Sequence, residues 1–269
     1  MLNLKTALKF SEKLAIKLGK YILDNRSRIK VVEQKDLVDI CTNIDKEVEQ
    51  IAIDEITKIY PDHNIHSEEV GFIDKKSDYT WYLDPIDGTK EFMRNMPIYQ
   101  TIITLETDSQ ILLGSVFQPT WRELFSANQN SGLYHNEKLK KVSNQKDINK
   151  SIIYYHPPNN KFPVDLFWED TKTLGELSLA SYRLRGDSND VIDLSWVASG
   201  AIEGYISLHT DLMIKWHDVS GGLLFVERAG GKVTDIYGKP IVNRDLSKGI
   251  VASNGKIHEQ LLEVINRSV

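Results

Sequence analysis

Two aspartates three positions apart are the first residues whose type and spacing could do chemistry. Asp84 and Asp87 lie in the stretch YLDPIDGTKEF, residues 82–92, with Pro85 between them and Gly88 directly after. Proline fixes its own φ and biases the preceding residue toward an extended conformation, while glycine tolerates backbone angles that other residues resist. The sequence therefore predicts a stiff, acidic bend that follows an apolar strand ending near residue 83.

Two interpretations of this acidic pair are open. The two carboxylates can converge with the Ile86 carbonyl on one point, and Mg²⁺ prefers such a set of oxygen ligands. Alternatively, they cap turns or a helix that begins near Thr89. A third reading, attack on phosphorus by an aspartate, needs the D-x-D-G-T spacing of haloacid dehalogenase phosphatases. Pro85 occupies the position of that nucleophile here, which disfavours an aspartyl-phosphate mechanism.

Two further acidic motifs could complete a metal site. Glu68 and Glu69 follow an apolar approach in IHSEE, and Asp218 opens a predicted helix in KWHDVSGG. Two acidic strand tips side by side repel each other unless a cation or hydrogen bonds intervene. The alternatives are surface loop charges for the glutamates and an N-cap for Asp218. A helix N-terminus also suits phosphate. Trp216 is expected in the core or in a cleft wall, and His217 is assigned to packing or to the surface rather than to a ligand role.

Hydrophobic periodicity predicts the elements that must position these acids. Apolar residues at helical spacing over 4–24 predict a first helix, and Thr42 with Asp45 predicts a cap for a second helix that stops before Pro61. Short apolar or alternating runs between 80 and 135 predict a mostly antiparallel sheet. The later predicted elements are strands at 151–156, 203–208, 231–235 and 249–253, and helices at 190–200, 218–229 and 255–267.

Composition places the chain among globular proteins. It has 269 residues, of which 41% are hydrophobic and 26% charged, and this length suits two α/β halves that share one cleft. We place the halves at 1–147, with the first metal-binding motif, and 148–269, with the second. The net charge of -5 disfavours a bulk nucleic-acid binder.

Cysteine content and hydropathy bear on the compartment. Cys41 is the only cysteine, so no intrachain disulfide can form, which fits a reducing environment. The N-terminal segment has lysines through its apolar positions, unlike a signal peptide, and no run approaches the roughly 20 apolar residues of a membrane span. We therefore expect a soluble, cytoplasmic protein that does not bind membranes.

The motifs together resemble the inositol monophosphatase superfamily. DPIDGTKEF, the preceding SEE and HDVSGGLLFVERAGGKVTD are similar to its two signature regions, and DICTNID, GSVFQPTWRELFSA and DLSWVASGAIEGYI extend the resemblance over most of the chain. The superfamily contains lithium-sensitive, Mg²⁺-dependent phosphatases, including 3′(2′),5′-bisphosphate nucleotidases. The resemblance implies a layered α-β-α-β-α sandwich of the sugar-phosphatase type, a homodimer, and hydrolysis by direct attack of a metal-activated water.

The resemblance also implies roles for individual residues. Thr89 and Glu68 would orient and deprotonate the water, and Asp45 would assist at a further metal position or through water. The backbone N–H groups of Gly88 and Thr89 would hold the phosphate, with Asp218 and Arg185 as further substrate contacts. The implied ligands of two or three Mg²⁺ ions are Glu68, Asp84, the Ile86 carbonyl, Asp87 and Asp218.

Departures from the family pattern bear on the substrate. The Asp-rich run at 185–190 replaces the usual Gly-Ser/Thr-Ala run and suits a polyol or an amine better than a second phosphate. Lys90 and Glu91 are closer to the nucleotidase branch, and Arg183 with Arg185 could bind an anion. We expect a small polyol phosphate, first inositol 1-phosphate. The alternatives are a 3′(2′),5′-bisphosphate nucleotidase and a fold-retaining partner of RNA-processing or transcription machinery.

Overall fold

The structure is a computed structural model that describes residues 2–34, 40–186, 189–212 and 214–268. The chain divides into two compact units, Met1–Lys138 and Leu139–Val269. This division falls nine residues before the boundary expected from the sequence, since 147 − 138 = 9. Within the described ranges, none of the helices combines the length and the apolar character that a bilayer crossing requires.

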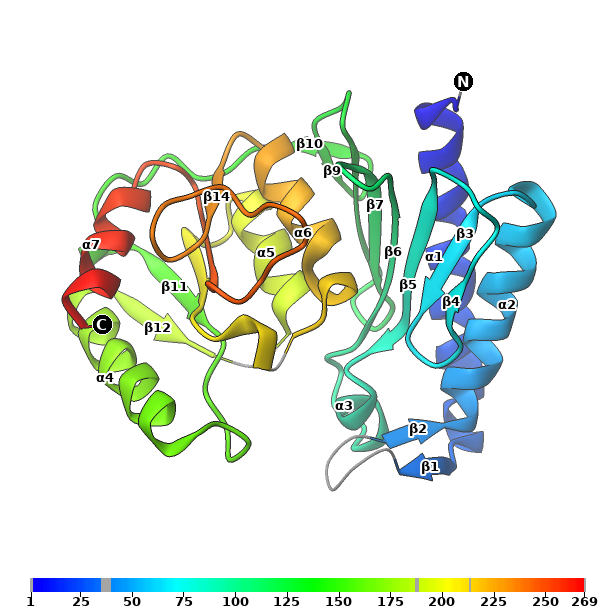
Figure 1. Ribbon diagram of the computed structural model, residues 1–269, viewed down its shortest axis with the longest axis horizontal. Coiled ribbons are helices and arrows are strands. Elements are labelled where there is room, and N and C mark those ends of the chain that lie inside the picture. The colour runs from blue at the N-terminus through cyan, green and yellow to red at the C-terminus, as the bar shows by residue number, and fades with distance from the viewer. Residues whose placement is uncertain (1, 35–39, 187–188, 213, 269) are drawn as a thin grey trace. The chain divides into compact units, whose positions relative to one another are not determined.

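The first unit is a helix layer on a mixed sheet (Figure 1). Helices α1 (Leu4–Asn25) and α2 (Asn43–Ile59) bury their apolar faces against the sheet in one continuous core. The eight strands run in the order β10-β9-β8-β7-β6-β5-β3-β4. The other elements are β1 (Val31–Gln34), β2 (Ile40–Thr42), β3 (Asn64–Ser67), β4 (Gly71–Ile73), β5 (Thr80–Asp87), α3 (Thr89–Met93), β6 (Gln100–Glu106), β7 (Ile111–Gln118), β8 (Glu123–Asn128), β9 (Leu133–His135) and β10 (Lys138–Lys140).

The sequence signals for the first two helices are confirmed. The first helix spans the predicted residues, and Asn3 caps it by accepting a hydrogen bond from the Thr6 N–H at 3.1 Å. The cap of α2 is the predicted pair: the Asp45 N–H donates to the Thr42 hydroxyl oxygen at 3.3 Å, and the Thr42 N–H donates to the Asp45 carboxylate at 3.0 Å. The prediction of a mostly antiparallel sheet is also confirmed, because β5, β6, β7 and β8 pair antiparallel in chain order.

The second unit has helices on both faces of a five-stranded sheet (Figure 1). Ile153 and Tyr155 of β11 belong to a core with α4 and α7, whereas the ring of the intervening Tyr154 packs edge-on against Trp196 of α5. The strand order is β12-β11-β13-β15-β14, and β11 is parallel to both of its neighbours. The elements are β11 (Ile152–Tyr155), α4 (Val164–Ala180), β12 (Arg183–Arg185), α5 (Asp190–Ser199), β13 (Gly204–Ser207), α6 (Trp216–Arg228), β14 (Lys232–Thr234), β15 (Ile250–Ser253) and α7 (His258–Ser268).

Two local expectations were wrong, and one long helix was missed. Strand β5 does not end near residue 83 but continues to Asp87, with a break in its register against β6 between Asp84 and Asp87. Helix α4 was not predicted at all. The expected N-cap at Asp218 is instead the third residue of a helix that begins at Trp216.

Candidate active site

Strand register brings two of the predicted ligands together. Strands β3 and β5 are parallel, and Ser67 lies opposite Leu83 at the last paired position of β3. The next residue on the first strand, Glu68, leaves β3 beside Asp84, which is still within β5, where adjacent backbones are about 4.8 Å apart. The Asp84 side chain is buried, with 3% exposure, and Glu68 is half-buried. The expected neighbourhood of the two acids is thus observed, but only Glu68 lies at a strand end, because β5 continues past Asp84.

The acidic bend is held by hydrogen bonds at each of its residues. The Asp84 carboxylate accepts from the Ile86 N–H at 3.0 Å, and the Thr101 hydroxyl donates to the Pro85 carbonyl at 3.0 Å. Farther along, the side-chain amide of Gln100 donates to the Asp87 carboxylate. These contacts fix the backbone of the bend, so its oxygen atoms are preorganised.

Gly88 is required by the backbone at the end of the bend. Its φ is +90°, in the left-handed region that side chains disfavour. A Cβ atom at this position would lie 2.8 Å from the Ile98 carbonyl oxygen. The short helix α3 begins at the next residue, as the sequence predicted. Glycine therefore lets the chain turn sharply between the two aspartates and Thr89.

The Thr89 hydroxyl connects the bend with helix α2. It lies 2.9 Å from Asp45 Oδ1 and 2.9 Å from the Ile86 carbonyl oxygen, and with one proton it can donate to one of these acceptors at a time. Burial raises the pKa of Asp45 to about 6, although hydrogen bonds from Thr42 and Thr89 act in the opposite direction. A buried carboxylate next to a hydroxyl is an arrangement that can accept and return a proton.

Two buried residues that the sequence reasoning missed support these loops. Gln100, which holds Asp87, is fully buried on β6, and Glu49 of α2 accepts hydrogen bonds from the turn around Glu68. Neither residue lies in a recognisable motif. Glu49 could have been found from its position four residues after Asp45, which puts both acids on one face of α2.

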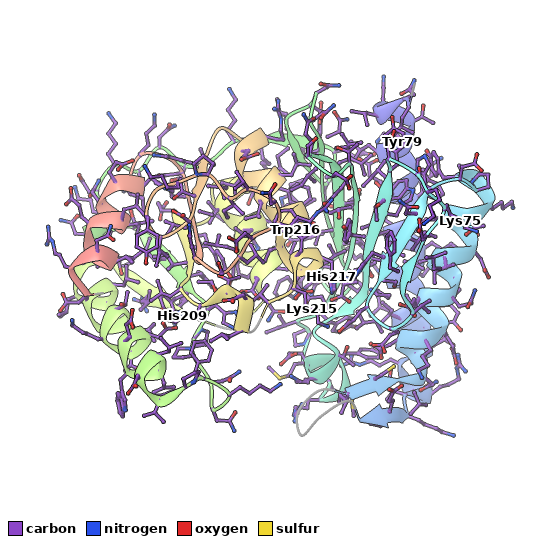
Figure 2. The ribbon with its side chains drawn as sticks, in the orientation of Figure 1. Lys75, Tyr79, His209, Lys215, Trp216 and His217 are labelled. Carbon is purple, nitrogen blue, oxygen red and sulfur yellow. The ribbon has the colours of Figure 1, made fainter. Side chains whose placement is uncertain are left out.

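In the second unit, Asp218 stabilises the start of α6. Its Oδ2 atom accepts from the Lys215 N–H at 2.7 Å, and its Oδ1 atom lies 3.2 Å from Nε2 of His217. Figure 2 shows Lys215, Trp216 and His217 where this helix begins. Asp218 therefore contributes to the cap of α6 as its third residue and not as the N-cap itself, and a metal role for this residue stays a prediction.

The expected substrate segment of the second unit is only partly described. Arg183 and Arg185 are exposed on β12, and the Arg183 guanidinium lies 5.4 Å from the centre of the Tyr182 ring. Asp187 and Ser188 lie outside the described residues, as does Asp39 of the DICTNID motif. The predicted role of Arg185 in binding an anion stays a prediction.

One aspartate of the Asp-rich run serves the interior of the second unit. Asp190 is buried and pairs through Oδ1 with Nδ1 of His156 at 2.7 Å, and it also accepts from the Tyr205 hydroxyl. Burial lowers the pKa of His156, but the neighbouring acids, Asp190 first among them, together raise the pKa above its ordinary value. The imidazole and carboxylate thus form a buried pair, so the Asp190 Oδ1 atom is occupied by interior contacts and not open to a polyol.

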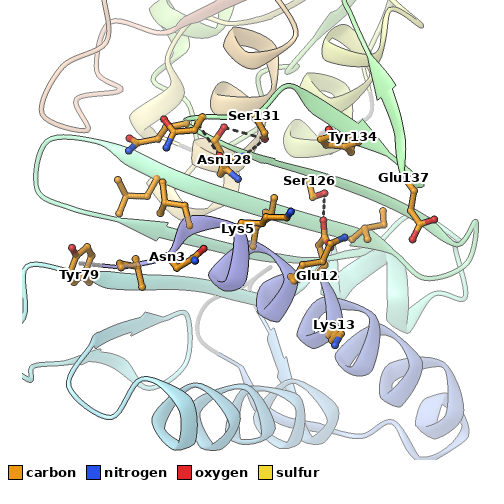
Figure 3. A pocket seen from close by; sticks show the side chains of 18 of the residues that line it. Asn3, Lys5, Glu12, Lys13, Tyr79, Ser126, Asn128, Ser131, Tyr134 and Glu137 are labelled. Carbon is orange, nitrogen blue, oxygen red and sulfur yellow. Dashed lines mark hydrogen bonds and ion pairs between the residues drawn. The ribbon is translucent and has the colours of Figure 1, made fainter.

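A large hollow in the first unit contains none of the predicted ligands. It has a volume of about 990 Å³ and lies between α1 and the sheet (Figure 3). On one wall the buried Glu12 carboxylate accepts from the Ser126 hydroxyl at 2.7 Å. The candidate site is therefore identified from the chemistry of its side chains and not from this hollow.

The residues of the bend, together with Glu68 of the neighbouring turn, fit a magnesium site. Glu68, Asp84, the Ile86 carbonyl and Asp87 supply only oxygen atoms, which is the donor set that Mg²⁺ prefers. Asp84 is buried beside a second acid, and such a pair is stable when a cation neutralises the two charges. The donor chemistry and the burial of Asp84 are both consistent with a bound divalent cation.

Comparison with known proteins identifies the family. Residues 3–269 match the inositol monophosphatase family. A fructose-1,6-bisphosphatase/inositol-1-monophosphatase from Thermotoga maritima is 30% identical over 97% of this chain and 96% of its own length. A Nus factor SuhB from Haemophilus influenzae is 32% identical over 96% of this chain and 95% of its own length. The solved structure of a Thermotoga maritima IMPase has a TM-score of 0.85, 28% identity, and 98% coverage of both chains.

The fold is thus that of a class of small-molecule phosphatases with a mixed α/β architecture. The chain belongs to the inositol monophosphatase family. Membership confirms the resemblance that the DPIDGTKEF and HDVSGG regions indicated, and it confirms the fold class. The comparisons support a phosphatase function.

Proposed function

We propose that this protein is a Mg²⁺-dependent phosphomonoesterase that hydrolyses a small polyol phosphate, with inositol 1-phosphate as the first choice. The observation that carries the proposal is the register of β3 and β5, which puts Glu68 beside Asp84 at one strand edge. The bend that follows adds the Ile86 carbonyl and Asp87. An oxygen-only acidic site of this kind suits a reaction whose main requirement is neutralisation of phosphate charge.

In this proposal two or three Mg²⁺ ions are held by Glu68, Asp84, the Ile86 carbonyl and Asp87. Asp218 is a further proposed ligand, because its HDVSGG motif resembles the second signature region of the family. Bound Mg²⁺ would neutralise the charge of the phosphate ester and make a water molecule more acidic. The carboxylates of the bend are already fixed by hydrogen bonds, so binding would require little rearrangement.

The other side chains of the site have proton-handling and orienting roles. The Thr89 hydroxyl orients the attacking water, and Glu68 accepts the proton. Asp45 holds the Thr89 hydroxyl in place and can take up a proton, because burial raises the pKa of Asp45 to about 6. The N–H groups of Gly88 and Thr89 bind the phosphate oxygens. No side chain becomes phosphorylated in this scheme.

Two alternative functions have a specific basis. Lys90 and Glu91 favour a 3′(2′),5′-bisphosphate nucleotidase, by their resemblance to that branch. Similarity to proteins named Nus factor SuhB favours a role as a partner of transcription machinery. Clustered carboxylates that bind no metal reduce stability, so the intact acidic bend is better explained by catalysis.

A panel of phosphate esters assayed with Mg²⁺ tests the proposal. The panel contains inositol 1-phosphate, fructose 1,6-bisphosphate and adenosine 3′,5′-bisphosphate. Fructose 1,6-bisphosphate is included because one relative is named a fructose-1,6-bisphosphatase/inositol-1-monophosphatase. We expect fastest turnover of inositol 1-phosphate, inhibition by millimolar Li⁺, and no turnover by Asp84→Asn. Turnover of the nucleotide alone would assign the protein to the nucleotidase branch. A cellular phenotype that survives in Asp87→Asn, while hydrolysis is lost, would favour the transcription role.

A further inference from the structure

The carboxylate of Glu49 lies beneath the turn that carries Glu68. Glu49 is on the inner face of α2 and is 2% exposed. Its Oε1 atom accepts from the Ser67 hydroxyl, from the Glu69 N–H at 2.9 Å and from the Val70 N–H at 3.2 Å. A single oxygen atom therefore anchors the chain on both sides of Glu68.

The turn, rather than a cation, satisfies this buried charge. Among the residues that the structure describes, Glu49 forms no ion pair, so its three donors all come from residues 67–70. Burial of a carboxylate is costly unless hydrogen bonds compensate, and bonds to a charged acceptor are stronger than neutral ones. The pairing is therefore a strong and specific constraint on the backbone around Glu68.

Helix α2 constrains the acidic bend with a second acid. Asp45, four residues before Glu49, accepts from the Thr89 hydroxyl at 2.9 Å. Residues four apart on a helix lie on the same face, about one turn apart. Two buried carboxylates of one rigid helix thus contact the Glu68 turn and the bend that ends at Thr89, and they fix the spacing between these two loops.

We propose that Glu49 is a positioning residue for Glu68: its Oε1 atom fixes the 67–70 turn so that Glu68 is presented to a divalent cation without rearrangement. This inference rests on the proposed metal-dependent function. Residues that orient metal ligands typically change metal affinity by about 10- to 100-fold when they are removed. A purely structural role would instead lower the stability of the fold and leave the affinity of the folded protein unchanged.

Titration of the full chain with Mn²⁺, followed by electron paramagnetic resonance without substrate, tests the proposal. Glu49→Met removes the acceptor oxygen, whereas Glu49→Gln keeps an acceptor in the same place, and both variants remove the charge. We expect Glu49→Met to weaken Mn²⁺ binding about tenfold or more and Glu49→Gln to restore most of the affinity. Equal Kd values for the two variants would overturn the role of the acceptor oxygen.

A double-mutant cycle shows whether Glu49 acts through Glu68. In a Glu68→Ala background the loss caused by Glu49→Met should disappear, because no side-chain ligand remains at position 68 to be positioned. Additive losses would overturn the inference while leaving the metal site intact. A wild-type protein that binds no Mn²⁺ would overturn the proposed function together with this inference.

A milder variant covers the case in which Glu49→Met does not fold, as judged by circular dichroism. Ser67→Ala removes one of the three donors and leaves both N–H groups in place. We expect a measurable rise in the Kd for Mn²⁺ that is smaller than tenfold. An unchanged Kd in folded Ser67→Ala would contradict the positioning role.

Discussion

Replacement of Thr89 by valine probes the chemistry of the candidate site most sharply. The Thr89 hydroxyl lies 2.9 Å from Asp45 Oδ1 and 2.9 Å from the Ile86 carbonyl oxygen. Valine has nearly the same shape but no hydroxyl, so the variant removes both contacts without opening a cavity. If Thr89 orients the attacking water, turnover should collapse while the fold survives.

The magnitude follows from the number and environment of the lost contacts. Loss of one hydrogen bond to the buried Asp45 carboxylate costs about 1–3 kcal/mol of folding free energy, which a chain of this size tolerates. An oriented group in the proton-transfer path contributes about 10²–10⁴-fold to rate. We therefore expect kcat of Thr89→Val to fall about 100- to 1,000-fold, equivalent to about 3–4 kcal/mol of transition-state stabilisation.

The assay is steady-state hydrolysis of inositol 1-phosphate at saturating Mg²⁺, with circular dichroism to confirm folding. Thr89→Ser is the matched control, because it keeps the hydroxyl and loses only the methyl group, and its kcat should stay within about tenfold of wild type. A folded Thr89→Val enzyme with kcat within tenfold of wild type would refute the role of the hydroxyl.

Three further predictions concern the bend, the metal and pH. Gly88→Ala should lower the free energy of unfolding by about 2 kcal/mol or more, because the φ of Gly88 is +90° and the new Cβ would lie 2.8 Å from the Ile98 carbonyl oxygen. A denaturant unfolding curve that matches wild type would contradict this. Mg²⁺ at about 100 times its Kd should raise the free energy of unfolding by about 2.7 kcal/mol, and Asp84→Asn should lose most of this gain in thermal melts with and without chelator. Burial, assisted by Lys232, lowers the pKa of His258 to about 4 from 6.5. The unfolded chain thus binds a proton at His258 more readily than the folded protein does. The free energy of unfolding that is present above pH 6.5 should therefore fall by up to about 3 kcal/mol as the pH is lowered toward 4. In denaturant titrations, His258→Gln should lose this part of the pH dependence.

The sequence predicted the elements that position the acids wherever the local signals were strong. The Thr42 cap with Asp45 placed the start of α2, and apolar runs placed β5 to β8. It also predicted that Glu68 and Asp84 lie on neighbouring strands, although Asp84 is inside β5 rather than at its end. These features depend on local periodicity and on residue types with narrow backbone preferences, which a single sequence displays directly.

The features that the sequence did not predict depend on tertiary contacts. Helix α4 presents few buried residues and exposes Val164, Trp168 and Leu179, so its hydrophobic pattern does not mark one inner face. Glu49 and Gln100 look like ordinary polar residues of a helix and a strand. Their support of the acidic loops exists only once α2 and β6 are packed beside them.

The central claim is that the acidic bend of the first unit binds the catalytic cations. A crystal structure with Mn²⁺ and inorganic phosphate, with anomalous diffraction data collected at the manganese edge, tests this claim most directly. We predict anomalous peaks within about 2.0–2.3 Å of oxygen atoms of Glu68, Asp84, Ile86 and Asp87, with phosphate beside Gly88. Well-ordered side chains at these residues with no anomalous peak between them, or Mn²⁺ bound elsewhere, would contradict it.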